Sequence, residues 1–423
     1  MSRRNLSSAA AIAVLSVIFF TWGGLTCLND VLIPHLKAVF SMNYARTMLI
    51  QLCFFSTYLV MGLPAGRVVA HVGYKHSIVV GLIVAGCGAL AFYPAAQVPS
   101  YPLFLLALFV LASGITLLQV AANPYISLLG DPRSASARLT LAQALNSLGT
   151  TLAPALIGPV ILSVAVLSDA ETARLPLGQQ LAYRSAQAHS VQLPYLGIAL
   201  ALFLLASFVY LFRLPPLTEA TEQADPQRHT FREVLQHRNL RFGVIAIFVY
   251  VGAEVAIGSF LINYISDPRI GDIDPARATR YVSLYWGGAM LGRFAGAALL
   301  RRFAPRSLLC LFALAALALL AITITSAGSL AMWSVVAIGL FNSIMFPTLF
   351  TLGIEDLGAM TSKASSLLIM AIVGGALIPY LQGRLADRVG IQPAFLLPLL
   401  CYGYIAWYAL RGSRPQAERC AAL

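Results

Sequence analysis

The feature that most constrains this chain is a series of long apolar runs that carry almost no charge. Each run is close to the ~20 residues that an α-helix needs to cross the hydrocarbon core of a bilayer. Charged residues make up 10% of the 423 residues, whereas a soluble domain carries about 25%. We therefore expect an all-α membrane protein with twelve transmembrane helices. The runs fall near residues 9–36, 44–69, 76–96, 102–129, 139–166 and 193–213, and again near 242–265, 281–300, 307–326, 330–352, 364–384 and 391–411.

The runs divide into two sets of six, separated by the longest strongly polar stretch of the chain, Pro215 to Arg241. This division predicts an N-terminal six-helix bundle over 1–213, a linker over 214–241, and a C-terminal bundle over 242–423 that ends in a short tail. Lys and Arg collect in alternate loops, and such loops stay on the cytoplasmic side. Both termini and the linker are therefore expected in the cytoplasm. The basic residues on that side are Arg3, Arg4, Arg67, Lys75, Arg133, Arg138, Arg301, Arg302, Arg306, Lys363, Arg411 and Arg414.

Composition and motifs exclude several classes of function. The net charge is +12, but the basic residues lie in short loops and set topology, so nucleic acid is not expected as a partner. The six cysteines lie mostly inside apolar runs without CxxC spacing, and the six histidines show no ligand spacing. No metal site, cofactor or disulfide framework is expected from them. The chain has neither a P-loop nor a nucleophile elbow, so we expect neither an enzyme nor an ATP-driven exporter.

Two carboxylates lie inside apolar runs, in corresponding places of the two halves. Asp30 stands in the first run, and Glu254 stands in the run that opens the second half. A charge at mid-membrane costs roughly 2.5–3.5 kcal/mol, so each carboxylate is a candidate for a functional site. Loss of water disfavours the charged form of a carboxylate, which suits a group that gains and loses a proton. The alternative for Asp30 is a structural ion pair with a basic residue of another helix, such as Arg293.

Amide side chains form stripes on two neighbouring runs of the first half. Gln119 and Asn123 are four residues apart and share one face of their helix, and Gln143 and Asn146 begin a second stripe. Amides both donate and accept hydrogen bonds, as sugar hydroxyls do, and within lipid they must face protein or a watery cavity. The alternative is interhelical bonding, worth ~0.6 kcal/mol per bond. Further candidates for a substrate site are Asn29, Gln51, Glu254, Asn263, Trp286 and Asn342.

A pattern of glycine and basic residues recurs at the equivalent place in each half. Small residues let two helices approach closely, and the basic residues hold the following loop on the cytoplasmic side. One copy would be ordinary packing, whereas its recurrence indicates a repeated architecture whose loops take part in conformational change. The residues of the pattern are Gly62, Gly66, Arg67 and Lys75 in the first half, and Gly292, Arg293 and Gly296 in the second.

The helix count, the central linker and the paired loops resemble the major facilitator superfamily. Further motifs, spread over nearly the whole chain, resemble the bacterial fucose–galactose–glucose:proton symporter family. The resemblance implies two pseudo-symmetric six-helix bundles, each built of inverted three-helix repeats, around a cavity that opens alternately to each side. It also implies a monomer in the bacterial inner membrane. The motifs are Leu28-Asn29-Asp30, Ala121-Ala122-Asn123-Pro124, Leu141-Ala142-Gln143-Ala144-Leu145-Asn146-Ser147, Tyr250-Val251-Gly252-Ala253-Glu254 and Phe346-Pro347-Thr348.

Two positions distinguish the branches of that family. Its fucose symporters carry a glutamate just before the Ala-Ala-Asn-Pro motif, where this chain has Gln119. They tend to have a neutral residue where this chain has Glu254. The combination resembles the glucose/galactose transporter branch.

The resemblance therefore implies cation-coupled symport of a hexose, D-glucose or D-galactose, by alternating access. The proton is the expected cation and Asp30 the expected proton site. Glu254 has three open roles: a second titrating group, an ionised acceptor of sugar hydroxyls, or a ligand of sodium. Sodium-coupled uptake of another monosaccharide or an amino sugar is the first alternative. A drug or metabolite efflux carrier, which would need a broad apolar pocket, and a non-transporting sugar receptor are the alternatives from other classes.

Overall fold

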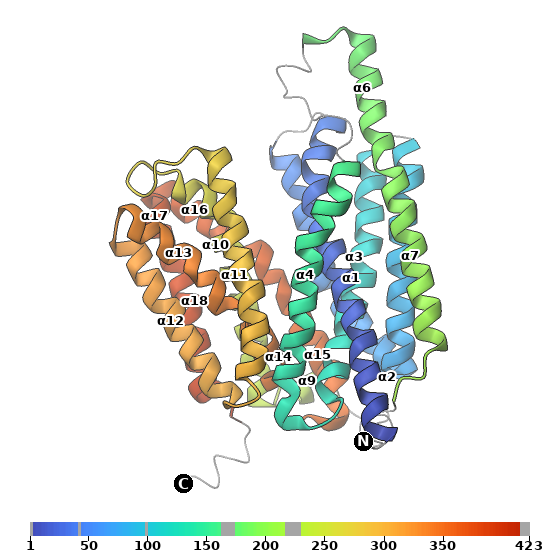
Figure 1. Ribbon diagram of the computed structural model, residues 1–423, viewed down its shortest axis with the longest axis vertical. Helices are drawn as coiled ribbons and strands as arrows, with labels where there is room; N and C mark the ends of the chain where they lie inside the picture. Colours follow the sequence, from blue (N-terminus) through green and yellow to red (C-terminus); the bar gives the residue numbers. More distant parts are fainter. Residues whose placement is uncertain (1–2, 41–43, 98–99, 162–173, 216–229, 415–423) are drawn as a thin grey trace. The chain divides into compact units, whose positions relative to one another are not determined.

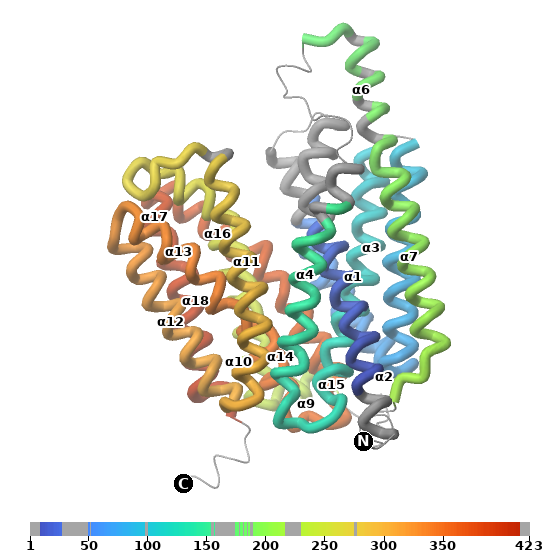
Figure 2. Tube along the Cα trace, viewed as in Figure 1, coloured from blue at the N-terminus to red at the C-terminus, as the bar shows by residue number. Residues whose placement is uncertain are grey.

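Every regular element is helical in the residues that the computed structural model describes (Figure 1), which are 3–40, 44–97, 100–161, 174–215 and 230–414. Side chains in several helical stretches, including 28–40, 44–49 and residue 51, lie outside the description and are grey in Figure 2.

The helices form two compact units. Unit 1 contains residues 1–122 and 145–216, and unit 2 contains residues 123–144 and 217–423. The last residues of α3 (Tyr101–Leu128) and the first part of α4 (Ala135–Ile161) therefore pack with the C-terminal helices. The bundle boundaries expected near residues 213 and 242 stay a prediction.

Unit 1 is built around α2, which packs along α7. α2 contains two of the predicted spans in one helical stretch, joined at Gly73, whose φ of 77° suits a residue without a Cβ. Close to this joint, Lys75 Nζ donates a hydrogen bond of 2.8 Å to the Tyr210 carbonyl at the C-terminal end of α7, where a cation is favourable. The helices of unit 1 besides α3 and α4 are α1 (Arg3–Phe40), α2 (Tyr44–Gln97), α6 (Leu177–Ser190) and α7 (Gln192–Leu211).

Helix α6 lies in the connection between the fifth and sixth predicted spans. It packs against α1 and α7. The stretch is too polar and too short to resemble a membrane span, so hydropathy alone could not separate a short helix from a loop. Tertiary packing supplies the stability that a 14-residue helix lacks in isolation.

Helices of unit 1 come into backbone contact where glycines face one another. A Cβ added at Gly149 of α4 would stand 2.1 Å from the Phe20 carbonyl oxygen of α1, and one at Gly23 would stand 2.2 Å from the Asn146 carbonyl oxygen. Such distances exclude any side chain. The α1–α4 contact therefore depends on these two glycines, as close helix packing in membranes generally does.

Unit 2 is arranged around α10, which packs against α11, α14, α16 and α18. Its side chains Tyr250 and Tyr264 are fully buried. The helices of this unit are α9 (Phe231–Val234), α10 (Arg238–Ile265), α11 (Pro275–Leu299), α12 (Pro305–Thr325), α13 (Gly328–Asn342), α14 (Met345–Gly353), α15 (Thr361–Met370), α16 (Gly374–Val389), α17 (Ile391–Ala394) and α18 (Leu396–Trp407).

The described helices account for all the predicted spans. Nine helical stretches among the described residues are long and apolar enough to cross a membrane. One of them, in α2, holds two spans, and the more polar α4 and α11 supply the remaining two of the twelve. The span expected near 330–352 is interrupted between Asn342 and Met345, where α13 ends and α14 begins. The all-α, twelve-helix fold class is confirmed.

We expect the substitution Gly339→Ala to destabilise the C-terminal helices. A Cβ at Gly339 would stand 2.1 Å from the Tyr285 carbonyl oxygen of α11, and overpacking of this kind costs about 1–3 kcal/mol. Thermal unfolding of the purified protein measures the loss. Gly287→Ala on α11, where nothing lies within 4 Å of the added Cβ, is the matched control. Equal melting temperatures for the two variants would contradict the close approach of α11 and α13.

Candidate functional site

The C-terminal helices hold a nearly buried ion pair within the membrane-spanning part of unit 2. Arg293 Nη2 of α11 lies 3.8 Å from Glu254 Oε1 of α10, and both side chains are less than a seventh exposed. The same Oε1 atom receives no hydrogen bond from the described residues. A carboxylate that is paired but not saturated with hydrogen bonds can still accept a proton or a ligand hydroxyl.

A chain of hydrogen bonds fixes the backbone of Glu254. Tyr402 Oη donates to Asn342 Oδ1 at 2.5 Å, and Asn342 Nδ2 donates to Tyr285 Oη at 2.7 Å. Tyr285 Oη donates in turn to the Glu254 carbonyl at 3.1 Å. Tyr250 Oη donates to the Asn342 carbonyl at 2.9 Å. All four partner side chains are fully buried, so the network holds α10, α11, α13 and α18 in one arrangement at the level of Glu254.

The network also changes the interpretation of Asn342. Sequence reasoning placed this amide among the sugar ligands. In the structure its side-chain oxygen, side-chain nitrogen and carbonyl each have a tyrosine partner. Asn342 therefore positions the residues around Glu254, and its role as a sugar ligand stays a prediction. Tyr250 lies in one of the motifs that carry the family resemblance, but the sequence does not indicate that Tyr250, Tyr285 and Tyr402 meet at this amide.

Trp286 and Asn263 lie at the exposed edge of the same helices. Trp286 is 42% exposed, and its ring packs 3.1 Å from the position of a Cβ on Gly258, one turn beyond Glu254 on α10. Its ring centroid lies 5.1 Å from that of Tyr285, edge to face. An exposed indole next to an intramembrane carboxylate can stack on the apolar face of a sugar ring. Asn263 is exposed as well.

The amides of the first stripe occupy buried positions on α3. Gln119 is 7% exposed, and its Nε2 donates to Tyr58 Oη at 3.0 Å. Tyr58 packs edge to face on Phe54, with ring centroids 5.8 Å apart. The side-chain oxygen of Gln119 is an acceptor beyond this bond, so the Gln119–Tyr58 pair can both hold its geometry and bind a hydroxyl group.

The two amides of the second stripe, Gln143 and Asn146, differ in what the structure shows of their contacts. Asn146 Nδ2 donates to the Phe19 carbonyl of α1 at 2.9 Å, which is the interhelical bonding considered as the alternative for this stripe. Gln143 is 7% exposed. Asn146 therefore ties α4 to α1 next to the glycine contact, and the binding role of Gln143 stays a prediction.

Two amides are buried without a partner among the described residues. Asn123 of α3 and Gln382 of α16 are each 0% exposed, and both polar side-chain atoms of each lack a hydrogen bond from the described protein. A buried amide without partners costs about 1–3 kcal/mol, so such atoms point to water or ligand. Asn123 was a candidate from the sequence.

Three sequence candidates fall outside the described side chains. Asn29 and Asp30 belong to α1 and Gln51 to α2, and their side-chain positions are not described. The proton-site role of Asp30 and the binding roles of Asn29 and Gln51 therefore stay predictions.

The glycine-basic pattern has different surroundings in the two halves. Gly62 and Gly66 are buried in α2, whereas Arg67 is exposed. In α11, a Cβ at Gly292 would stand 2.7 Å from Ser343 Oγ, and one at Gly296 would stand 2.2 Å from Ile344 Cγ2. Gly292 and Gly296 thus bring α11 against the α13–α14 break, and Arg293 lies between them. Arg293 was assigned to a conformational loop motif, and its pairing with Glu254 was not foreseen.

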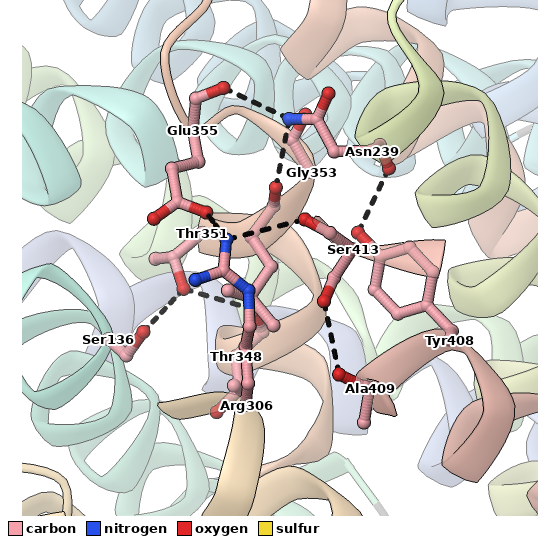
Figure 3. A network of polar contacts seen from close by, with 11 residues as sticks. Ser136, Asn239, Arg306, Thr348, Thr351, Gly353, Glu355, Tyr408, Ala409 and Ser413 are labelled. Carbon is pink, nitrogen blue, oxygen red and sulfur yellow. Dashed lines mark hydrogen bonds and ion pairs between the residues drawn. The ribbon is translucent and has the colours of Figure 1, made fainter. Parts of the chain in front are cut away.

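A second polar network, which sequence reasoning missed, lies at the ends of α12 and α14 (Figure 3). Arg306 pairs with Glu355 and donates to the Ser413 carbonyl at 3.4 Å. Asn239 Nδ2 donates to the carbonyls of Leu352 and Glu355 at 3.2 and 3.0 Å. These side chains cap the C-terminal end of α14, whose carbonyls have no helical partners. Arg306 had been interpreted only as a topology signal.

Comparison with known proteins identifies the family. The sequence profile described as Major Facilitator Superfamily matches residues 14–378. The chain belongs to the Major Facilitator Superfamily. A glucose/galactose transporter of Brucella abortus is 50% identical over 404 residues, covering 96% of this chain and 94% of the relative. An L-fucose-proton symporter of Escherichia coli is 35% identical, covering 94% of this chain and 92% of the relative.

Solved structures agree with this family assignment. The crystal structure of the E. coli fucose:proton symporter has a TM-score of 0.89 at 34% identity, covering 96% of this chain and all of that chain. A proton:xylose symporter has a TM-score of 0.69 at 12% identity, covering 96% of this chain and 97% of that chain, and supports the fold alone. These results confirm the predicted resemblance to the fucose–galactose–glucose:proton symporters and their glucose/galactose branch. The relatives are transporters, so the chain is a multi-pass membrane transporter and not an enzyme.

Proposed function

We propose that this transporter takes up a hexose, D-glucose or D-galactose, together with a proton across a bacterial inner membrane. The observation that carries the proposal is the 50% identity, over almost the full length of both chains, to a protein named as a glucose/galactose transporter. The relative named as an L-fucose-proton symporter supports proton coupling. Sodium is the alternative coupling ion. We further propose that the carrier works as a monomer with both termini in the cytoplasm, as the distribution of basic loops indicates.

The two halves contribute different chemistry to the proposed cycle. In the N-terminal half, Asp30 takes up and releases the coupling proton, and the Gln119–Tyr58 pair and Asn123 bind sugar hydroxyls. In the C-terminal half, Glu254 accepts hydroxyl hydrogen bonds or a second proton, and Trp286 stacks on the sugar ring. The support for these roles is the burial of Gln119, Asn123 and Glu254, together with the side-chain atoms of Asn123 and Glu254 that receive no hydrogen bond from the described residues.

Uptake by the purified full-length chain in proteoliposomes tests the function directly. Each sugar is supplied under an imposed proton gradient, under a sodium gradient, and without any gradient. The panel contains D-glucose, D-galactose, L-fucose, D-xylose and an amino sugar. We expect glucose and galactose to accumulate only under the proton gradient. Accumulation driven by the sodium gradient alone would show that sodium, and not the proton, is the coupling ion. Accumulation of fucose in preference to both hexoses would contradict the proposed substrate.

We expect Gln119→Ala to weaken sugar binding. Loss of one hydrogen bond to a ligand costs about 0.5–1.5 kcal/mol, or roughly 2- to 13-fold in affinity. Tyr58→Phe removes the hydroxyl that receives the Gln119 Nε2 hydrogen bond and leaves the amide in place, so its effect should be smaller. Titration of sugar binding to the detergent-solubilised variants measures both affinities, and Gln180→Ala on α6 is the control. An unchanged affinity in Gln119→Ala would show that the amide only packs helices.

A further inference from the structure

The first two turns of α10 present a face that changes from basic to apolar. Arg238, Arg241, Phe242 and Ile245 stand at positions i, i+3, i+4 and i+7, so they share one side of the helix. Arg241 is exposed, Arg238 and Phe242 are partly buried, and Ile245 is 42% exposed. This α10 face therefore begins with two arginines and continues as an accessible apolar surface along the membrane-spanning part of the helix.

Both arginines lie over one aromatic ring. The guanidinium carbons of Arg238 and Arg241 are 5.2 and 4.9 Å from the ring centroid of Phe242, within the range of cation–π contacts. The ring attracts each cation but carries no net charge. It therefore brings two positive charges together without neutralising them.

No acid among the described residues pairs with these two arginines, and the buried Nε atom of Arg238 has no hydrogen-bond acceptor there. The only carboxylate of α10 is Glu254, about four turns further along the helix. Two acids of neighbouring segments are engaged elsewhere, Glu355 with Arg306 and Glu233 in the capping box of α9. The positive end of the α10 helix dipole adds to the two charges, so the position favours an anion.

The end of α18 forms an aromatic surface beside the α10 face. Tyr404 Oη donates to the Phe242 carbonyl at 3.3 Å, and the Trp407 ring packs edge to face on Phe242, with centroids 5.0 Å apart. Tyr408 Oη donates to the Asn239 carbonyl at 2.9 Å (Figure 3). Tyrosine and tryptophan are typical of the boundary between membrane and water. The two arginines therefore stand where α10 and α18 reach the membrane surface.

We propose that Arg238 and Arg241 bind the phosphate group of an anionic phospholipid, whose acyl chain lies along the exposed side of Ile245. Guanidinium groups bind phosphate oxygens through charge-assisted hydrogen bonds. A free phosphate would leave the apolar part of the α10 face uncovered, whereas a phospholipid matches both parts. The assignment to the cytoplasmic leaflet rests on the orientation proposed above, and the lipid site itself does not depend on which sugar is carried.

Thermal stabilisation of the purified full-length chain measures lipid binding without any transport. The detergent-solubilised protein is stripped of native lipid and titrated with dioleoyl phosphatidylglycerol, with dioleoyl phosphatidylethanolamine, and with inorganic phosphate. A ligand that binds only the folded state raises the melting temperature. We expect phosphatidylglycerol to act at the lowest concentration and inorganic phosphate to have no effect. Stabilisation by inorganic phosphate would indicate a site for free anions, and equal midpoints for the two lipids would exclude recognition of the negative charge. Either result overturns the proposal.

The two arginines should account for the preference for anionic lipid. Each arginine near the membrane surface strengthens this attraction roughly 5-fold, so the variant with both Arg238→Gln and Arg241→Gln should need about 30-fold more phosphatidylglycerol. The matched control carries Arg301→Gln and Arg302→Gln, which remove two exposed arginines between α11 and α12. Its midpoint should stay nearly unchanged. Equal shifts in the two double variants would overturn the site, because general positive charge would then explain the effect.

Phe242→Leu distinguishes a shaped site from a charged surface. It keeps both arginines and an apolar side chain and removes the ring over which the guanidinium groups lie, so the midpoint should rise several-fold. Each midpoint is measured against the lipid-free melting temperature of the same variant, which separates binding from general stability. An unchanged midpoint would contradict the shaped site. If the parent protein responds to no lipid, the proposal fails, and the acids of the polar linker, Glu219, Glu222 and Asp225, become the expected partners of the arginines.

Discussion

The substitution Asp30→Asn should abolish proton-driven sugar accumulation and preserve sugar exchange. Asparagine matches the size and neutrality of a protonated aspartate but cannot take up or release a proton. Accumulation in proteoliposomes under an imposed proton gradient should therefore fall to the level of protein-free liposomes. Counterflow, in which labelled sugar exchanges for unlabelled sugar without net proton movement, should continue. Accumulation and exchange differ because a neutral residue 30 lets the sugar-loaded carrier reorient, whereas no proton is bound or released along with the sugar.

The control for this variant is a carboxylate outside the apolar part of its helix. Asp387 near the end of α16 is exposed, so Asp387→Asn should retain both accumulation and exchange. Loss of sugar binding in Asp30→Asn would contradict the role of proton carrier and indicate a direct sugar ligand. Retained accumulation would show that coupling resides elsewhere, with Glu254 as the next residue to test.

Hydropathy was sufficient to predict the fold, because the membrane imposes one rule on every span. Each apolar run had to be a helix, and the uncharged lengths gave its approximate bounds. Helix α6 lies outside that rule, since it is too polar to be a span. Gly73 likewise joins two spans into one helical stretch, which a hydropathy profile records only as a polar gap.

The sequence predicted the types of residue in the candidate site better than it predicted which of them contact one another. Glu254 stood out because a charge within an apolar run is costly. Its partner Arg293 did not, because spacing along α11 assigned it to the glycine-basic pattern, and only packing shows which helix an arginine faces. Asn342 illustrates a different limit. An amide in a membrane helix has to bond to something, and sequence cannot distinguish three tyrosines from a sugar.

The contact of α4 with α14 leads to a second large expected effect. Ser136 Oγ, in the first turn of α4, lies 2.6 Å from Thr351 Oγ1 of α14 (Figure 3). The next residue, Ala137, packs with Leu300, Leu308 and Ile344 in one apolar cluster. Residues 123–144 belong to unit 2, whereas α4 continues into unit 1. Because α4 belongs to the N-terminal half of the sequence and α14 to the C-terminal half, alternating access of the two halves leads us to expect that this contact breaks and re-forms during the transport cycle.

A disulfide between Ser136→Cys and Thr351→Cys should arrest uptake reversibly. Two hydroxyl oxygens in hydrogen-bond contact place their Cβ atoms within the range that a disulfide spans. Oxidation of the double variant should lower sugar uptake at least ~10-fold, since a covalent bond cannot open on the timescale of turnover, and a reducing agent should restore it. Each single-cysteine variant controls for oxidation of the native cysteines and should keep its activity. Full uptake by the cross-linked protein would mean that α4 stays on α14 throughout the cycle, and opening would then have to occur by bending within α4, beyond the Ser136–Thr351 contact.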